Sequence, residues 1–220
     1  MYNMENIKGI IFDLDGTLFD TEYYQWQGWV VPLREFGIEL TKEKYFDYAG
    51  KKGEDIEKEL IRDFNLNINE GDLLSKKKEL LEEWFSTETI SLLPFAKEIV
   101  DFFHNNDAYK LALCSGGPRE EVLLKLRRND FLKYFPIIIT SSDVERGKPF
   151  PDMYKKAAED IGLDYNQCLA FEDTQYGVQS AKDAGLACFA IPNEYSQRQD
   201  FSIADKILNS LGEALEIFKG

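Results

Sequence analysis

Two kinds of hydrophobic pattern occur along the chain, and they predict different elements. Short runs that are almost entirely apolar predict buried strands, because a strand covered on both faces has no polar side. Most of these runs are followed by glycine, serine or acidic residues, which are typical of turns. The predicted strands are Lys8–Phe12, Tyr109–Cys114, Ile137–Thr140, Cys168–Phe171 and Ala187–Ile191.

Longer segments carry apolar residues at the helical spacing of three to four positions. In the segment Thr21–Phe36, for example, Trp26, Trp29 and Leu33 follow this spacing, and Gly37 ends it. The other predicted helices are Lys42–Ala49, Glu54–Phe64, Glu70–Phe85, Phe95–His104, Pro118–Arg128, Asp152–Ile161, Thr174–Ala184 and a last one near Ser210–Phe218.

The order of these elements predicts the fold class. From residue 92 onward strands and helices alternate, which requires a mostly parallel sheet with helices on both faces. Residues 20–91 are almost wholly helical and separate the first strand from the others. We therefore predict an α/β core domain from residues 1–19 and 92–220, with a helical insert from residues 20–91. A length of 220 residues is compatible with one domain carrying an insert.

The charge balance limits the possible partners. With 40 acidic and 26 basic residues the formal net charge is −14, and a field of this sign repels nucleic acid and anionic membranes. No apolar stretch is long enough for a membrane helix, and Met1–Ile7 lacks the pattern of a secretory signal, so we expect a cytoplasmic protein. Cys114, Cys168 and Cys188 lie in apolar runs without metal-site spacing, and we expect buried thiols.

Polar clusters follow the ends of the predicted strands. The segment Asp13–Thr17 follows the first strand, Ser115–Gly117 the second and Glu172–Asp173 the fourth, while Lys148 lies in the loop after the third. Ligands of open parallel sheets bind beyond the carboxyl ends of the strands, where these loops converge. All four clusters are therefore expected at one edge of the sheet.

The acidic residues of these clusters also have an ordinary structural interpretation. Asp13 and Asp15 could form a turn and a helix N-cap, and Glu172–Asp173 could cap the following helix. However, two carboxylates so close to the end of a buried strand are costly without a cation or hydrogen-bond donors. The grouping of the acidic residues favours a hard divalent cation bound through oxygen, and Mg²⁺ in particular.

The remaining clusters are suited to an anion. Ser115 and Gly116 precede a helix, whose free N–H groups bind phosphate oxygens well, although a simple turn is the alternative. Lys148 could be a solvated loop lysine, as most lysines are. At an acidic edge it would instead supply the positive charge that an anionic substrate needs.

Together these motifs identify a family resemblance that covers the whole chain. The segment Asp-Leu-Asp-Gly-Thr at 13–17, Ser115, the Lys148-Pro149 pair and the acidic pair at 172–173 occur in the order found in the haloacid dehalogenase-like (HAD) superfamily. The chain resembles its subfamily I, which has a helical C1 cap inserted after the first motif, and is similar to the β-phosphoglucomutase-like phosphatases. The resemblance implies a Rossmann-like three-layer core, with residues 20–91 as the cap.

The resemblance also implies roles for individual residues. Asp13 matches the nucleophile that becomes an aspartyl-phosphate, and Asp15 matches the general acid/base. Thr17 would bind substrate and would order both the turn and Asp15. Lys148 would be both catalytic and substrate-binding. Ser115 and Gly116 would bind the phosphate, and the Mg²⁺ ligands would be Asp13, Asp15 through its carbonyl, Glu172 and Asp173.

The expected activity is hydrolysis of a small phosphorylated metabolite, such as a sugar, polyol or nucleoside phosphate. Family members that cleave carbon–halogen bonds lack the acid that corresponds to Asp15. The mutases carry a cap histidine where this chain has Gln25 and an arginine where it has Gly53, so water is the expected acceptor. A phosphoglucomutase-type phosphotransferase and a non-catalytic phosphate-binding protein remain the alternatives.

Two further expectations concern the cap. Its lysines, namely Lys42, Lys44, Lys51, Lys52 and Lys76–Lys78, are interpreted as solvated, which disfavours the Schiff-base chemistry of phosphonate-cleaving members. Its candidates for contacting the leaving group, each of which could equally be helix packing, are Tyr23, Tyr24, Gln25, Trp26, Lys51, Lys52 and Trp84. We assign His104 to ordinary structure and expect a monomer, because the cap must move freely.

Overall fold

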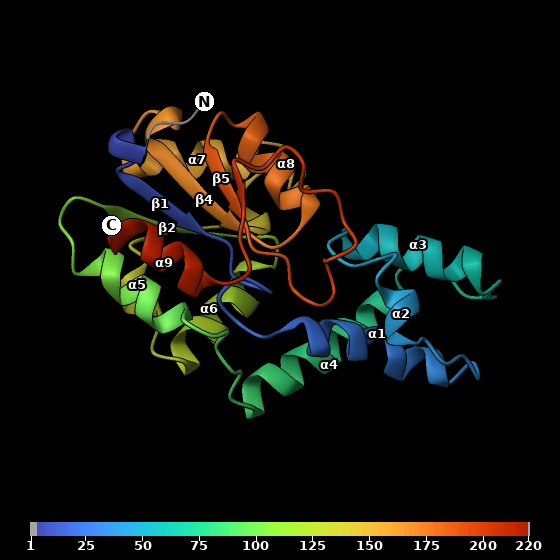
Figure 1. Ribbon diagram of the computed structural model, residues 1–220. Coiled ribbons are helices and arrows are strands. Elements are labelled where there is room, and N and C mark those ends of the chain that lie inside the picture. Colours follow the sequence, from blue (N-terminus) through green and yellow to red (C-terminus); the bar gives the residue numbers. More distant parts are fainter. Residues whose placement is uncertain (1–3, 220) are drawn as a thin grey trace.

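The computed structural model describes residues 4–219 and contains a parallel sheet in the order β3-β2-β1-β4-β5-β6 (Figure 1). Each pair of neighbouring strands runs parallel. The strands are β1 (Gly9–Phe12), β2 (Lys110–Ser115), β3 (Ile137–Thr140), β4 (Cys168–Glu172), β5 (Ala187–Ala190) and β6 (Lys206–Ile207). The predicted α/β fold with a Rossmann-like core is confirmed.

Helices cover both faces of the sheet. Alternate residues of β1 point to opposite faces, as the pleat of a strand requires. Ile10 and Phe12 pack with α5 (Ala96–His104), α6 (Arg119–Arg128) and α9 (Leu211–Lys219), whereas Ile11 packs with α7 (Asp152–Ile161) and α8 (Gln175–Asp183). All four residues of β1 are buried, which explains its continuous apolar sequence.

Residues 20–91 form four helices that lie to one side of the sheet (Figure 1). They are α1 (Glu22–Arg34), α2 (Lys42–Tyr45), α3 (Gly53–Asp63) and α4 (Asp72–Thr87). Trp29, Tyr48 and Leu60 are at the centre of a hydrophobic cluster within this segment. Leu81 and Phe85, near the end of α4, pack instead with the apolar residues of the sheet.

The two connections of the helical segment lie side by side. Asp20 N donates to Ser91 O at 2.9 Å, and Leu93 N donates to Leu18 O at 2.9 Å. The chain therefore leaves the region of the sheet and returns to it at one place. This pairing fits the predicted boundary at residues 19/20 and 91/92, although the division into two domains stays a prediction.

Most predicted elements differ from the observed ones by one or two residues at their ends. The exception is the predicted helix Lys42–Ala49, which stops at Tyr45 and continues as turns to Gly50. Tyr45 and Tyr48 are both buried, and the turns between them direct both rings inward. Strand β6 was not predicted, because its two residues are exposed and form no apolar run.

One expectation about burial is confirmed and one is wrong. Cys114, Cys168 and Cys188 are buried free thiols. His104 is exposed and its ring packs against that of Tyr134, and its assignment to ordinary structure stays a prediction. Lys77, however, is buried and only 7% exposed, so it is not a solvated lysine. Within residues 4–219 no helix combines the length and apolar character that crossing a membrane requires.

Candidate active site

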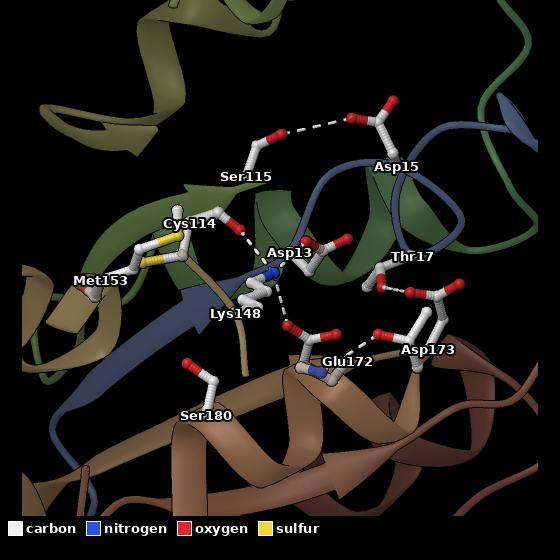
Figure 2. A network of polar contacts seen from close by, with 12 residues as sticks. Asp13, Asp15, Thr17, Cys114, Ser115, Lys148, Met153, Glu172, Asp173 and Ser180 are labelled. Carbon is white, nitrogen blue, oxygen red and sulfur yellow. Dashed lines mark hydrogen bonds and ion pairs between the residues drawn. The ribbon is translucent and has the colours of Figure 1, made fainter. Parts of the chain in front are cut away.

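The polar clusters meet at the carboxyl ends of β1, β2 and β4, as the parallel sheet requires. Asp13 directly follows β1, and its N–H donates to Phe171 O at 3.0 Å. Lys148 reaches this point from the loop after β3. Its ammonium group contacts the Asp13 carboxylate, Glu172 Oε1 at 2.5 Å and Cys114 O at 3.1 Å (Figure 2). Lys148 therefore links the ends of the three central strands.

Asp13, Glu172 and Asp173 form a buried acidic cluster. Each residue offers a carboxylate oxygen, and these oxygens lie within 4.8 Å of one another. Burial raises the pKa of Asp13 to about 8 against the attraction of Lys148, and burial with the neighbouring Asp13 raises the pKa of Asp173 well above its ordinary value. Glu172 Oε2 is buried and has no hydrogen-bond partner among residues 4–219. A crowded oxygen cluster with a spare acceptor fits a hard divalent cation.

Neutral side chains hold two residues of the acidic cluster by hydrogen bonds. Tyr154 on α7 donates its hydroxyl to Glu172 Oε1 at 2.5 Å. Asn193 Nδ2 donates to Asp173 Oδ2 at 2.7 Å and to Gly16 O at 3.2 Å. Neither residue was predicted from the sequence, since a single buried tyrosine or a loop asparagine carries no signal that separates it from ordinary packing.

The Asp15 carboxylate does not belong to this cluster. Figure 2 shows it turned toward Ser115, whose hydroxyl donates to Asp15 Oδ2 at 3.2 Å. The other carboxylate oxygen accepts from the Lys125 ammonium of α6. Burial alone would raise the pKa of Asp15, but the charge and hydrogen bond of Lys125 hold it below its ordinary value. The expected contribution of the Asp15 carbonyl to a metal site stays a prediction.

Thr17 and Gly116 occupy different surroundings. The Thr17 hydroxyl donates to Asp173 Oδ1 at 3.5 Å; its expected roles in binding substrate and in ordering the turn and Asp15 stay predictions. Gly116 is exposed, and apart from its two chain neighbours no residue lies within 4 Å of the position that a Cβ would take. The space beside Gly116 is consequently open to a ligand.

Two buried lysines near Asp15 were also missed. Lys125 is fully buried, and Lys77 on α4 has its Nζ 4.6 Å from the centre of the Trp29 ring. Burial lowers the pKa of Lys77 to about 8. The signal in the sequence was helical spacing, because Lys77 lies four residues from both Leu73 and Leu81, which are buried.

A cavity of about 390 Å³ lies between the helical segment and the core, and it includes Lys148. Its lining contains Lys51 and Lys52, two of the candidates for contacting the leaving group. Three aromatic candidates make contacts within the cap: Tyr24 contacts Trp84 and donates to Glu88 Oε2 at 2.7 Å, and Trp26 donates to Leu40 O at 3.0 Å. The cavity is lined by Gly50, Lys51, Lys52, Asp55, Lys58, Glu59, Lys148, Pro149, Phe150 and Tyr176.

Comparison with known proteins places this chain in a family. Residues 10–191 match the family model described as haloacid dehalogenase-like hydrolase. Protein CbbY of Rhodobacter capsulatus is 31% identical over 94% of this chain and 95% of its own length. The phosphorylated carbohydrates phosphatase of Thermotoga maritima is 29% identical over 82% of each chain. The crystal structure of CbbY from Rhodobacter sphaeroides in complex with phosphate shares the fold, with a TM-score of 0.80 at 24% identity over 94% of this chain and 96% of that one.

Proposed function

This chain belongs to the haloacid dehalogenase-like hydrolases, and we propose that it is a Mg²⁺-dependent phosphatase that hydrolyses a small phosphorylated metabolite through an aspartyl-phosphate on Asp13. The observation that carries the proposal is the position of Lys148 between Asp13 and Glu172 at the convergence of three strands. A carboxylate attacks phosphorus only when positive charge offsets the negative charge that develops on the phosphoryl oxygens. Lys148 is placed to supply part of that charge.

In the first step an Asp13 carboxylate oxygen forms a bond to phosphorus, and the bond from phosphorus to the leaving oxygen breaks. Asp15, which must carry a proton when this step begins, gives it to that oxygen, which departs as an alcohol. In the second step water attacks phosphorus and gives a proton to Asp15, and the bond to Asp13 breaks. Ser115 and the backbone N–H of Gly116 would hold the phosphoryl oxygens during both steps.

Asp13, Glu172 and Asp173 would hold Mg²⁺, with Asp15 contributing its carbonyl. The buried, unpaired Glu172 Oε2 and the raised pKa of Asp173 support this assignment, because both mark carboxylate oxygens that lack a cationic partner. When bound, the ion would neutralise charge on the transferring phosphoryl group. The protein residues would orient it, and Tyr154 and Asn193 would fix two of its ligands.

We further propose that residues 20–91 act as the cap and that the cavity at its boundary with the core receives the leaving group. The cavity volume of about 390 Å³ suits a molecule of the size of a sugar phosphate. The phosphorylated carbohydrates phosphatase of Thermotoga maritima is one of the similar proteins, which favours sugar phosphates over the other candidate substrates. Lys51 and Lys52 would contact polar groups of such a substrate.

The test is a screen of phosphorylated metabolites with Mg²⁺ in which release of inorganic phosphate is measured. The panel should include β-glucose 1-phosphate with its bisphosphate activator, because a mutase would convert it without releasing phosphate. We expect phosphate release that Asp13→Asn lowers by at least about a thousandfold while the fold is retained. Unchanged turnover in Asp13→Asn, or isomerisation in place of hydrolysis, would refute the proposed reaction.

A further inference from the structure

Lys125 is a buried cation close to the proposed reaction that no family motif accounts for. Its side chain is 0% exposed, and its ammonium group contacts the Asp15 carboxylate and Glu121 Oε1, the latter at 2.8 Å. The ring of Phe85 on α4 lies 5.0 Å from Nζ. A lysine is rarely buried to this extent unless its charge is paired. The two carboxylates provide that pairing.

The contacts of Lys125 fix the orientation of Asp15. One Asp15 oxygen accepts from Lys125, and the other accepts from Ser115 at 3.2 Å. Ammonium and hydroxyl are both donors here, so each carboxylate oxygen is held as an acceptor. A carboxylate has about four acceptor positions, of which these contacts use two. The side chain of Asp15 is 19% exposed, so part of it is accessible to water.

The two acidic residues of the first motif are thus held by different lysines. Lys148 contacts Asp13, and Lys125 contacts Asp15. Helix α6, which carries Lys125, is itself attached to the end of α4, because Arg128 donates to the carbonyls of Ser86 and Thr87. The position of Lys125 is therefore set by contacts between the core and the last turn of the helical segment.

We propose that Lys125 is a positioning residue for the second step of the reaction, in which it holds Asp15 as the acceptor of the water proton. The proposal rests on the proposed function. In this step water forms a bond to phosphorus, its proton passes to Asp15, and the bond from phosphorus to Asp13 breaks with the electron pair returning to Asp13. Without Lys125 the Asp15 carboxylate would lose one of its two anchors, and the aspartyl-phosphate would persist.

The test is pre-steady-state kinetics with p-nitrophenyl phosphate and Mg²⁺. Nitrophenolate is a good leaving group that needs no proton, so the first step should not depend on Asp15. For Lys125→Met we expect a burst of about one nitrophenolate per protein, then a steady state about a hundredfold slower than that of the unaltered chain. KM should fall together with kcat, which leaves kcat/KM within about threefold of the original value.

Three further variants serve as controls. Lys125→Arg retains the charge and should recover part of kcat. Glu121→Gln keeps the contact between Lys125 and Asp15 but removes the second carboxylate that holds Lys125, so it should lower kcat in the same way but by less. It also serves as the test if Lys125→Met does not fold. Lys97→Met breaks an exposed ion pair with Asp101 on α5, at 2.5 Å, and should leave kcat and the burst unchanged.

The outcomes separate the two proposals. A loss of kcat and kcat/KM by the same factor without a burst, or a kcat within about twofold of the original in both Lys125→Met and Glu121→Gln, would refute the positioning role alone. If the unaltered chain cleaves neither p-nitrophenyl phosphate nor any phosphate ester of the screen, the proposed function fails, and the role of Lys125 fails with it.

Discussion

The backbone of Gly177 lies directly against the carboxylate of Glu172. A Cβ on Gly177 would lie 1.9 Å from Glu172 Oε2, a separation that no pair of unbonded atoms tolerates. Glu172 cannot move aside freely, because its Oε1 is held by Tyr154 and Lys148. The first turn of α8 is therefore part of the wall that positions this carboxylate.

We predict that Gly177→Ala destabilises the fold by about 2 kcal/mol or more, because it overpacks a buried charged site. The free energy of unfolding from urea titration measures this effect. Gly147→Ala is the matched control, since nothing lies within 4 Å of its Cβ position, and its change should stay within about 1 kcal/mol. Equal effects of the two substitutions would contradict the packing argument.

Lys148→Ala should lower kcat/KM by about a hundredfold to a thousandfold, because it removes the charge that would stabilise the transferring phosphoryl group. It also leaves Asp13 and Glu172 in a buried site without their shared cation. Phosphate release from the best substrate of the screen measures the loss. Lys156→Ala is the control, because Lys156 is half-buried and pairs with Asp160 at 3.2 Å away from the site. A normal kcat/KM in Lys148→Ala would exclude the proposed role.

Metal binding should appear as a change in thermal stability that is independent of activity. At a Mg²⁺ concentration a hundredfold above Kd, the unaltered chain should gain about 2.7 kcal/mol. Asp173→Asn should lose most of that gain, yet without metal it should be at least as stable as the unaltered chain, because it carries one carboxylate fewer in the crowded cluster. Thermal unfolding with Mg²⁺ and with a chelator compares the two, and Asp101→Asn is a distant control. An equal gain in both proteins would place the ion elsewhere.

Asp143, in the segment that leads to Lys148, should make a contribution to stability that depends on pH. Burial alone would raise its pKa, but hydrogen bonds from Thr140 and the guanidinium of Arg119 lower it below the ordinary value. At pH values between the folded and the unfolded pKa of Asp143, the unfolded chain binds more protons than the folded one. The stabilisation that ionised Asp143 provides is therefore complete above about pH 4 and is lost as the pH falls through the folded pKa. Asp143→Asn should therefore cost about 1 kcal/mol at neutral pH and progressively less in acid.

Urea titrations of both proteins at several pH values check this prediction. A stability difference that stays constant into acid would show that the charge of Asp143 is not its source. Because the Arg119 side chain is 43% exposed, added salt should reduce the difference further.

Several parts of the site could be read directly from local sequence. An apolar run that ends in an acidic residue indicates a buried strand with a carboxylate at its carboxyl end, which applies to Asp13 and to Glu172. Parallel strands carry these ends to a common edge, so their proximity to Ser115 and Lys148 follows from the fold class. The ends of elements were less predictable. Helix α2 stops before Tyr48, and the burial of Tyr48 beyond its end depends on tertiary packing.

The sequence by itself determined the α/β class, the helical segment between the first two strands and the edge at which the acidic residues meet, because these depend on periodicities and strand ends within short stretches. Only the tertiary structure decided that Lys125 contacts Asp15, 110 positions away, and that Asn193 contacts Asp173 and Gly16. Such pairs depend on the faces that helices and loops present to one another and on the direction of long side chains. Neither property leaves a periodic trace in the chain.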